Sequence, residues 1–252
     1  MQKATIMRNI AKLAIAASLA ALATPASASF LVTYEAAGAT NSTAGFDYFG
    51  IETFDGRGPG QTSFSETYSH DGKDIELSYT DVTIIPADAY GGAGGSDYAV
   101  VGLFSETRSY TIDITASPVS GINYFGYWLS ALDEYNYVSF WSGSNKVFEF
   151  DPTDVKALLL GKPEYLGHPV TGENENEPYV FLNFFYQTGT FNRVVFHQAG
   201  DTGAGYESDN HTVGFYTTTS GTPITQVPEP AALGMIGVGL LGIAALHRRR
   251  RV

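Results

Sequence analysis

Short runs of alternating apolar and polar residues dominate the chain from residue 29 to residue 226. A period of two places every second side chain on the same side of an extended strand, and a helical period is almost absent. Two runs show this most clearly, each with three large apolar residues on one face: Ile75, Leu77 and Tyr79, and then Tyr110, Ile112 and Ile114. Gly, Asp, Asn and Pro separate the runs, as is typical of turns. These features predict an all-β domain built from antiparallel strands.

The same pattern extends along most of the chain. Further strands are expected at residues 30–36, 62–69, 97–104, 122–130, 135–141, 145–150, 179–186, 190–197 and 211–218. About ten strands with turn residues between them are typical of an antiparallel β-sandwich or jelly roll, which we assign to residues 29–218. The sequence contains no cysteine, so no disulfide can stabilise this domain. A single domain of about 200 residues buries enough apolar surface to fold without one.

Three segments interrupt the strands. A short helix is expected to begin at Pro152, which suits a first helical position, with Asp151 as its cap and Val155 to Leu160 supplying its apolar side. Residues 87–95 contain four glycines and should form a flexible loop, and residues 167–178 should form an acidic surface loop. The glycines are a poor phosphate cradle, because neither a lysine nor a helix start follows them.

The N-terminus has the composition of a cleavable secretory signal peptide. Lys3, Arg8 and Lys12 accompany an uncharged, mostly apolar run at residues 13–23. This run is too short to remain as a bilayer-spanning helix, and the small residues up to Ala28 fit the site of a signal peptidase. We therefore expect signal peptidase to remove residues 1–28 and the rest of the chain to be exported.

The C-terminus carries a second apolar run. Residues 231–246 are uncharged and are followed by His247 and then by four arginines: Arg248, Arg249, Arg250 and Arg251. As a helix this run would span about 24 Å, and local thinning of the bilayer can absorb its shortfall from about 30 Å. Clustered arginines beside an apolar run stay in the cytoplasm. Residues 231–252 are therefore predicted to be a single transmembrane helix with an arginine-rich tail.

Pro228, Glu229 and Pro230 lie directly before this helix, in a linker predicted at residues 219–230. Pro-Glu-Pro, a short hydrophobic helix and a terminal arginine cluster, in this order, resemble the PEP-CTERM sorting domain. The resemblance implies recognition by an exosortase, a membrane transpeptidase, with removal of the helix and delivery to the cell surface or extracellular matrix. It also implies a bacterium that makes exopolysaccharide. The three motif residues and the arginines would then be substrate residues for another enzyme.

The charged residues divide the chain into the same parts. All 26 Asp and Glu residues lie between residues 29 and 230, with only seven of the 14 Lys and Arg residues, so the exported part has a net charge of −19. Such a charge repels nucleic acid and anionic lipid. We therefore expect no nucleic-acid partner.

Residues 122–141 are the segment densest in aromatic residues, and we expect a hairpin of two strands joined around residues 130–134. Aromatic rings on a sandwich can stack on sugars. The candidates here are Tyr124, Tyr127, Trp128, Tyr135, Tyr137 and Trp141. The alternative for each ring is that it points inward and fills the core.

Alternation separates the rings of the second strand by face. Tyr135, Tyr137 and Trp141 fall on one side, and Val138 and Phe140 fall on the other. The wholly apolar side should face the core. Tyr135, Tyr137 and Trp141 are therefore the candidate glycan-binding residues.

A second resemblance covers residues 121–214. It is carried by the aromatic segment and by two motifs, Asp133-Glu134-Tyr135-Asn136 and Tyr206-Glu207-Ser208-Asp209-Asn210. Together they resemble a group of exosortase-dependent surface proteins that has no assigned molecular activity. The resemblance implies a β-sandwich surface protein and does not indicate a reaction.

The oxygen-bearing side chains of these motifs are the ligands that a hard cation such as Ca²⁺ prefers. The candidate ligands are Asp133, Glu134, Asp209 and Asn210. No EF-hand spacing accompanies them, and the alternative is that they are solvated loop carboxylates and turn residues. The sequence indicates no other cofactor.

No catalytic arrangement is recognisable in the sequence. His70, His168, His197 and His211 lack the spacing of a zinc site, and no G-x-S-x-G elbow is present. We therefore expect a non-enzymatic structural or adhesive protein of the envelope or matrix that binds polysaccharide. The alternative is an extracellular polysaccharide hydrolase, which would need two facing carboxylates at the base of an aromatic cleft.

Overall fold

The computed structural model describes residues 30–60, 62–102, 105, 107–132, 135–200 and 204–224. These residues form one unit whose regular secondary structure is mostly β-strand. The predicted signal peptide, the Pro-Glu-Pro segment and the predicted transmembrane helix lie outside them, as do Asp133 and Glu134. Among the residues described, no helix is long and apolar enough to cross a membrane.

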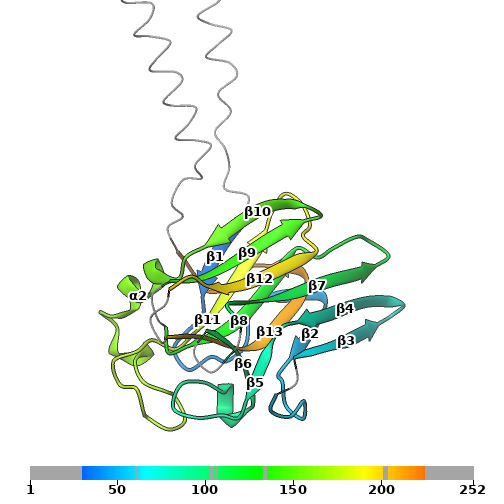
Figure 1. The fold of residues 1–252 in the computed structure, drawn as a ribbon. Helices are drawn as coiled ribbons and strands as arrows, with labels where there is room; N and C mark the ends of the chain where they lie inside the picture. Colours follow the sequence, from blue (N-terminus) through cyan, green and yellow to red (C-terminus); the bar gives the residue numbers. More distant parts are fainter. Residues whose placement is uncertain are drawn as a thin grey trace, which may run out of the picture. The chain divides into compact units, whose positions relative to one another are not determined.

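The strands form two sheets that pack face to face (Figure 1). Sheet A has eight strands, in the order β14 (Thr222–Pro223), β1 (Phe30–Tyr34), β11 (Val180–Tyr186), β8 (Tyr124–Ser130), β13 (Gly205–Thr218), β6 (Tyr98–Gly102) and β5 (Thr83–Ile85), with β2 (Gly45–Glu52) also paired to β13. Sheet B has six strands, in the order β10 (Asn145–Phe150), β9 (Asn136–Ser142), β12 (Arg193–Gln198), β7 (Ser109–Ser117), β4 (Lys73–Thr80) and β3 (Ser63–His70). All named neighbours are antiparallel. The predicted all-β fold with two antiparallel sheets is confirmed.

One large hydrophobic cluster fills the space between the sheets. From sheet B it takes the apolar faces that alternation predicted: Ile75, Leu77, Tyr79, Tyr110, Ile112 and Ile114, all buried. From sheet A it takes residues such as Phe125 and Tyr127 on β8. Each large side chain removed from water contributes about 1.5–3 kcal/mol. This cluster is therefore the main source of stability of the sandwich.

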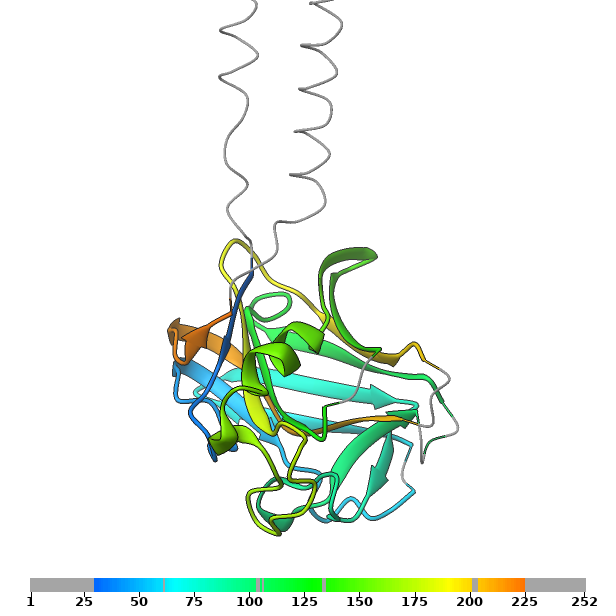
Figure 2. The ribbon, with the colours of Figure 1, turned by 90° about the vertical axis from the view of Figure 1, so that its left-hand side faces the viewer.

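The predicted short helix is present as α2 (Thr153–Leu159). The Asp151 carboxylate accepts a hydrogen bond of 2.9 Å from the backbone N–H of Thr153, which satisfies one free donor at the helix start. Val155 and Leu159 enter the core cluster. Figure 2 shows α2 facing the viewer at one end of the sandwich.

The predicted hairpin at residues 122–141 is wrong. Strand β8 pairs with β11 and β13 in sheet A, whereas β9 pairs with β10 and β12 in sheet B. The segment crosses from one sheet to the other, and the inward faces of its two strands meet across the core, with 6.1 Å between the ring centroids of Phe125 and Phe140. The sequence pattern is the same whether two strands pair in one sheet or face each other across the core. Alternation alone therefore could not distinguish a hairpin from this crossing.

Strand β2 was not expected, because its inward residues are not a simple apolar series. Tyr48, Gly50 and Glu52 are buried, while Phe49 is exposed. Gly50 is required by close packing, since a Cβ atom there would lie 2.1 Å from the ring of Tyr68. The outward Phe and the inward Gly together hide the alternation.

The sandwich also extends beyond its predicted end at residue 218. Tyr34 pairs with Thr222, and the backbone N–H of Ile224 donates to the carbonyl of Val32 at 2.9 Å. Ile224 is itself buried. Residues 219–224, predicted to belong to the linker, are therefore part of the folded domain.

Candidate functional site

The side of sheet B that faces away from the core is the candidate site, and we call it the outer face. Its strands alternate between buried residues and partly exposed ones. On β9, Val138 and Phe140 are fully buried, as predicted, while Tyr137 and Trp141 are partly exposed on the opposite side. The two rings therefore lie at a surface that a ligand can reach.

Strand pairing arranges the outer-face residues in rows across the sheet. His197 on β12 lies between Ser109 on β7 and Tyr137 on β9. Next to this row, Val195 lies between Thr111 and Ser139. The following row consists of Asp113, Arg193, Trp141 and Lys146.

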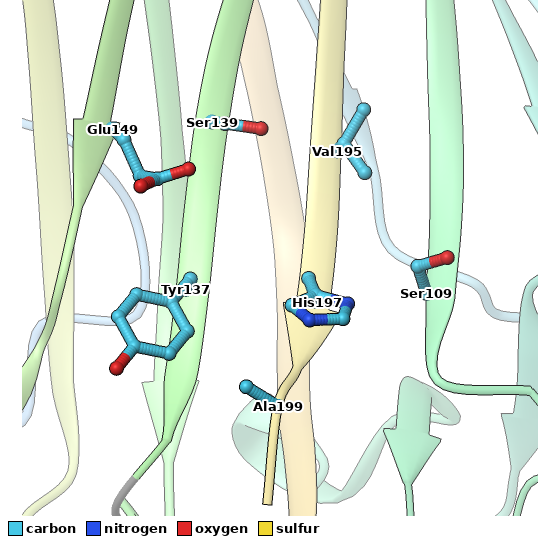
Figure 3. Close-up of a pocket in the computed structure, with 7 residues that line it drawn as sticks. All are labelled: Ser109, Tyr137, Ser139, Glu149, Val195, His197 and Ala199. Carbon is cyan, nitrogen blue, oxygen red and sulfur yellow. The ribbon is translucent and has the colours of Figure 1, made fainter.

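The first row borders a shallow hollow of about 520 Å³ (Figure 3). It is lined by Ser109, Tyr137, Ser139, Glu149, Val195, His197 and Ala199. Figure 3 shows the Tyr137 ring and the Glu149 carboxylate on one side of the hollow, with the His197 ring beside them. Burial and the nearby carboxylates of Asp151 and Glu149 raise the pKa of Tyr137, so its hydroxyl remains protonated.

A second hollow of about 330 Å³ continues along the same strands. It is lined by Thr80, Thr111, Asp113, Trp141, Arg193 and Val195. Val195 lines both hollows, so they adjoin. The indole Nε1 of Trp141 donates a hydrogen bond of 3.0 Å to the hydroxyl of Ser139, which fixes the ring over the surface.

The carboxylates that line the two hollows, Glu149 and Asp113, form ion pairs. The guanidinium Nε of Arg193 lies 2.6 Å from a carboxylate oxygen of Asp113, and the ammonium group of Lys146 lies 2.7 Å from a carboxylate oxygen of Glu149. All four side chains are between 43% and 50% exposed. Each exposed pair contributes about 0–1 kcal/mol to stability.

Tyr135 is separated from the other two candidate rings. It precedes β9 and has a left-handed backbone with φ 68°, so the alternation of the strand does not extend to it. Its side chain is 46% exposed, but it lines neither hollow. The structure brings Tyr137 and Trp141 together on the outer face and leaves Tyr135 outside it.

The rings of β8 cannot bind sugar on a surface. Tyr124, Tyr127 and Trp128 are all buried. Tyr127 points into the core, and Trp128 packs on the other side of sheet A against Tyr179, with 5.6 Å between ring centroids. The hypothesis of a sugar platform is wrong for these three residues, because β8 is covered on both faces.

Asp209 and Asn210, two of the predicted metal ligands, lie inside sheet A rather than in a loop. Both are buried on β13. One carboxylate oxygen of Asp209 accepts hydrogen bonds from the backbone N–H of Ala93 (2.7 Å) and the hydroxyl of Ser96 (2.6 Å), and the other accepts from the backbone N–H of Asn210 (2.6 Å). Burial nevertheless raises the pKa of Asp209 to about 7. It is not the solvated loop carboxylate of the alternative interpretation.

The described residues contain no group of three or more His, Asp or Glu side chains that could hold a metal ion. The amide group of Asn210 donates to the carbonyl of Thr40 at 2.8 Å and so has a structural partner. The remaining candidates, Asp133 and Glu134, lie outside the described residues, so the Ca²⁺ site stays a prediction.

The glycine-rich loop at residues 87–95 is not a flexible excursion. Gly91, Gly92 and Ala93 are buried, and Ala93 is held by Asp209. A Cβ atom on Gly92 would lie 2.4 Å from the carbonyl oxygen of Ser96. The glycines let this loop pack tightly over sheet A.

His211 is a core residue. It is fully buried, and its ring is stacked 5.2 Å from that of Phe196 while Nδ1 lies 3.0 Å from the hydroxyl of Tyr79. Burial lowers the pKa of His211 to about 3, so the ring is neutral. Its position among aromatic rings gives it a packing role.

The residues that sequence reasoning missed are those that β7 and β12 bring to the outer face, above all Arg193, Val195 and His197. Their alternation is visible in the sequence. The signal that was lacking is strand order, because residues 109–113 and 193–197 become neighbours of Tyr137 only through the topology of sheet B.

Comparison with known proteins confirms the predicted sorting signal. Residues 226–251 match the family model of the PEP-CTERM protein-sorting motif. The chain ends in a PEP-CTERM sorting motif. Such a motif implies an exported surface protein that an exosortase processes. The match does not reach residues 121–214, so the second resemblance stays a prediction.

The folded domain has a distant structural neighbour. The crystal structure of a cleaved adhesin domain of Lys-gingipain is 16% identical in sequence, and the alignment covers 66% of this chain and 97% of that one with a TM-score of 0.38. No curated protein matches the sequence of the chain.

Proposed function

We propose that this exosortase-sorted surface protein is an adhesive or structural component of the cell surface or matrix that binds polysaccharide through the outer face of sheet B. The observation that carries the proposal is the partly exposed position of Tyr137 and Trp141 on one strand, above two adjoining hollows. Aromatic rings beside hydroxyl and charged groups are a typical surface for sugars, because the ring face covers apolar C–H groups while polar groups bind hydroxyls.

The route to the surface belongs to the same proposal. Signal peptidase would remove residues 1–28, and the helix predicted at 231–252 would hold the chain in the membrane until exosortase acts at Pro228, Glu229 and Pro230. Exopolysaccharide outside the cell would then be the polymer that the domain meets.

The described outer face favours binding over hydrolysis. A glycosidase needs one carboxyl group as acid and a second as base or nucleophile. Here Glu149 is paired with Lys146 and Asp113 with Arg193, and the two carboxylates line different hollows. Both hollows are shallow, whereas a hydrolase would place its carboxylates at the base of a cleft. We therefore propose a binding protein rather than an enzyme.

The test is the loss of polysaccharide binding on Tyr137→Ala. The full-length chain, purified in detergent, would be measured by affinity electrophoresis in gels that contain purified bacterial exopolysaccharide. We expect retardation to fall with Tyr137→Ala and to persist with Phe49→Ala, a matched control that removes a ring that is 49% exposed on β2 of sheet A. Equal retardation of wild type and Tyr137→Ala, or none for the wild type, would contradict the proposal.

A further inference from the structure

We infer that the ligand of the outer face is an uncharged, linear polysaccharide that lies along β9, with one sugar on Tyr137 and another on Trp141. This inference rests on the proposed function and adds to it the class of glycan and the direction in which the chain runs. Three features of the outer face carry it: the spacing of the rings, the chemistry between them and the pairing of the charges.

The two rings mark the ends of one continuous surface. Tyr137 and Trp141 are four residues apart on β9, which corresponds to about 13 Å along a strand. The hollow beside Tyr137 and the hollow beside Trp141 share Val195 as a common wall. A chain that contacts both rings must therefore run parallel to the strand and cover several sugar units. A single small sugar would contact only one ring.

Beside and between the rings the surface offers groups that both donate and accept hydrogen bonds. Ser109, Thr111 and Ser139 contribute hydroxyls to the two hollows. A hydroxyl can rotate to match either a donor or an acceptor, which suits the many hydroxyls of a neutral sugar. Val195 adds an apolar patch for their C–H groups.

The charges of the surface are already balanced. Among the described residues of the two hollows, Asp113 is paired with Arg193, and Glu149 is paired with the neighbouring Lys146. An anionic polysaccharide would have to break these pairs to reach a cation. It would also approach an exported chain of net charge −19, which repels polyanions over roughly 8–10 Å at physiological salt. An uncharged glycan meets neither obstacle.

The experiment compares neutral and anionic polysaccharides at low and high salt. The full-length chain in detergent would be run by affinity electrophoresis against a neutral glucan, a neutral mannan, alginate and hyaluronate. We expect retardation by a neutral polymer, unchanged by salt, and none by the anionic polymers. Tyr137→Ala and Trp141→Ala should each weaken binding about fivefold, and the double variant about 25-fold, because rings this far apart act independently. Phe49→Ala should bind like the wild type.

The outcomes separate this inference from the proposed function. If alginate or hyaluronate binds, and high salt or Arg193→Gln abolishes that binding, the inference is wrong while the outer face remains a glycan site. If the double variant binds no more weakly than either single variant, the two rings do not hold one chain and the direction along β9 is wrong. If no polysaccharide of either class binds, the proposed function itself fails.

Discussion

Sheets A and B contribute to the same core but differ on their other sides. Sheet B leaves its outer face uncovered, and along most of β4 and β7 buried residues alternate with partly or fully exposed ones. The centre of sheet A is covered on both sides, so all seven residues of β8 and the first ten of β13 are buried, whereas β2 leaves Phe49 exposed. Strands buried on both faces read as continuous apolar or mixed runs, whereas half-solvated strands alternate.

Loops cover sheet A, and polar side chains hold these loops in place. Asp209 holds the glycine-rich loop through Ala93 and Ser96. On the same side, the hydroxyl of Tyr179 donates to the carbonyl of Ala89 at 2.8 Å, which connects that loop to residues 163–179. The centre of sheet A, at β8 and the start of β13, is therefore buried on both faces. In sheet B the strands β9, β12 and β7 keep one side partly exposed, where a ligand can reach it.

The largest effect that the comparison predicts is a difference in stability between alanine variants of the two tryptophans. Trp128→Ala should lower the free energy of unfolding by about 3–5 kcal/mol, because it leaves a cavity under the loops of sheet A. Trp141→Ala on the outer face of sheet B should cost less than about 1 kcal/mol, since its ring is partly solvated in the folded chain. Urea unfolding of the two variants, followed by tyrosine and residual tryptophan fluorescence, measures both values.

Equal losses for the two variants would mean that the outer face of sheet B is as buried as that of sheet A. In that case Trp141 would belong to a second packed layer, and the comparison of the sheets would fail.

The same comparison explains what the sequence could predict. Alternation identified the core residues of β4, β7 and β9, because one side of each is solvated. The start of β13, Tyr206 to Asn210, lies before the strand expected at residues 211–218, and its Glu, Ser, Asp and Asn residues are rarely buried. Tyr206 and Ser208 face the core, whereas Asp209 is buried because a loop more than 100 positions away packs on it. No local pattern reports such a contact.

For the candidate site, alternation predicted which residues of β9 face outward but not which strands lie beside β9. Parity along β9 separated Tyr137 and Trp141 from Val138 and Phe140, which the structure bears out. The predicted hairpin partner, β8, lies in the other sheet. The true neighbours, β10 and β12, depend on strand order, which follows from the packing of the whole chain rather than from any single segment.

The second prediction concerns pH and the loops of sheet A. The pKa of Asp209 is about 7 in the fold, compared with about 3.9 in the unfolded chain. Between these values the folded state binds the proton and the unfolded state does not. The contribution of Asp209 to stability is therefore full below pH 4 and is lost as the pH rises to 7, by up to about 4 kcal/mol.

Asp209→Asn removes the carboxyl group that titrates, so the difference in stability between wild type and variant reports the contribution of Asp209 at each pH. Urea unfolding of wild type and variant at several pH values should give curves that diverge between pH 4 and 7 and run parallel above pH 7. Curves that stay parallel over the whole range would show that Asp209 ionises like a solvated carboxylate. The loop over sheet A would then be open to water, as the outer face of sheet B is.

The smallest effect belongs to the ion pair of the outer face. Arg193 and Asp113 lie 2.6 Å apart, but their side chains are 43% and 50% exposed, so water screens their attraction. A double-mutant cycle with Arg193→Gln and Asp113→Asn should give a coupling energy below about 1 kcal/mol, and high salt should reduce it further. Glu35→Gln, directly after β1 of sheet A, is the contrasting case, because that buried carboxylate accepts hydrogen bonds from Thr43 and Asn183. This substitution should lower the free energy of unfolding by about 1–3 kcal/mol. A coupling energy of that size between Arg193 and Asp113 would mean that their side chains are shielded from water. A polysaccharide could not then reach them without first displacing whatever covers them.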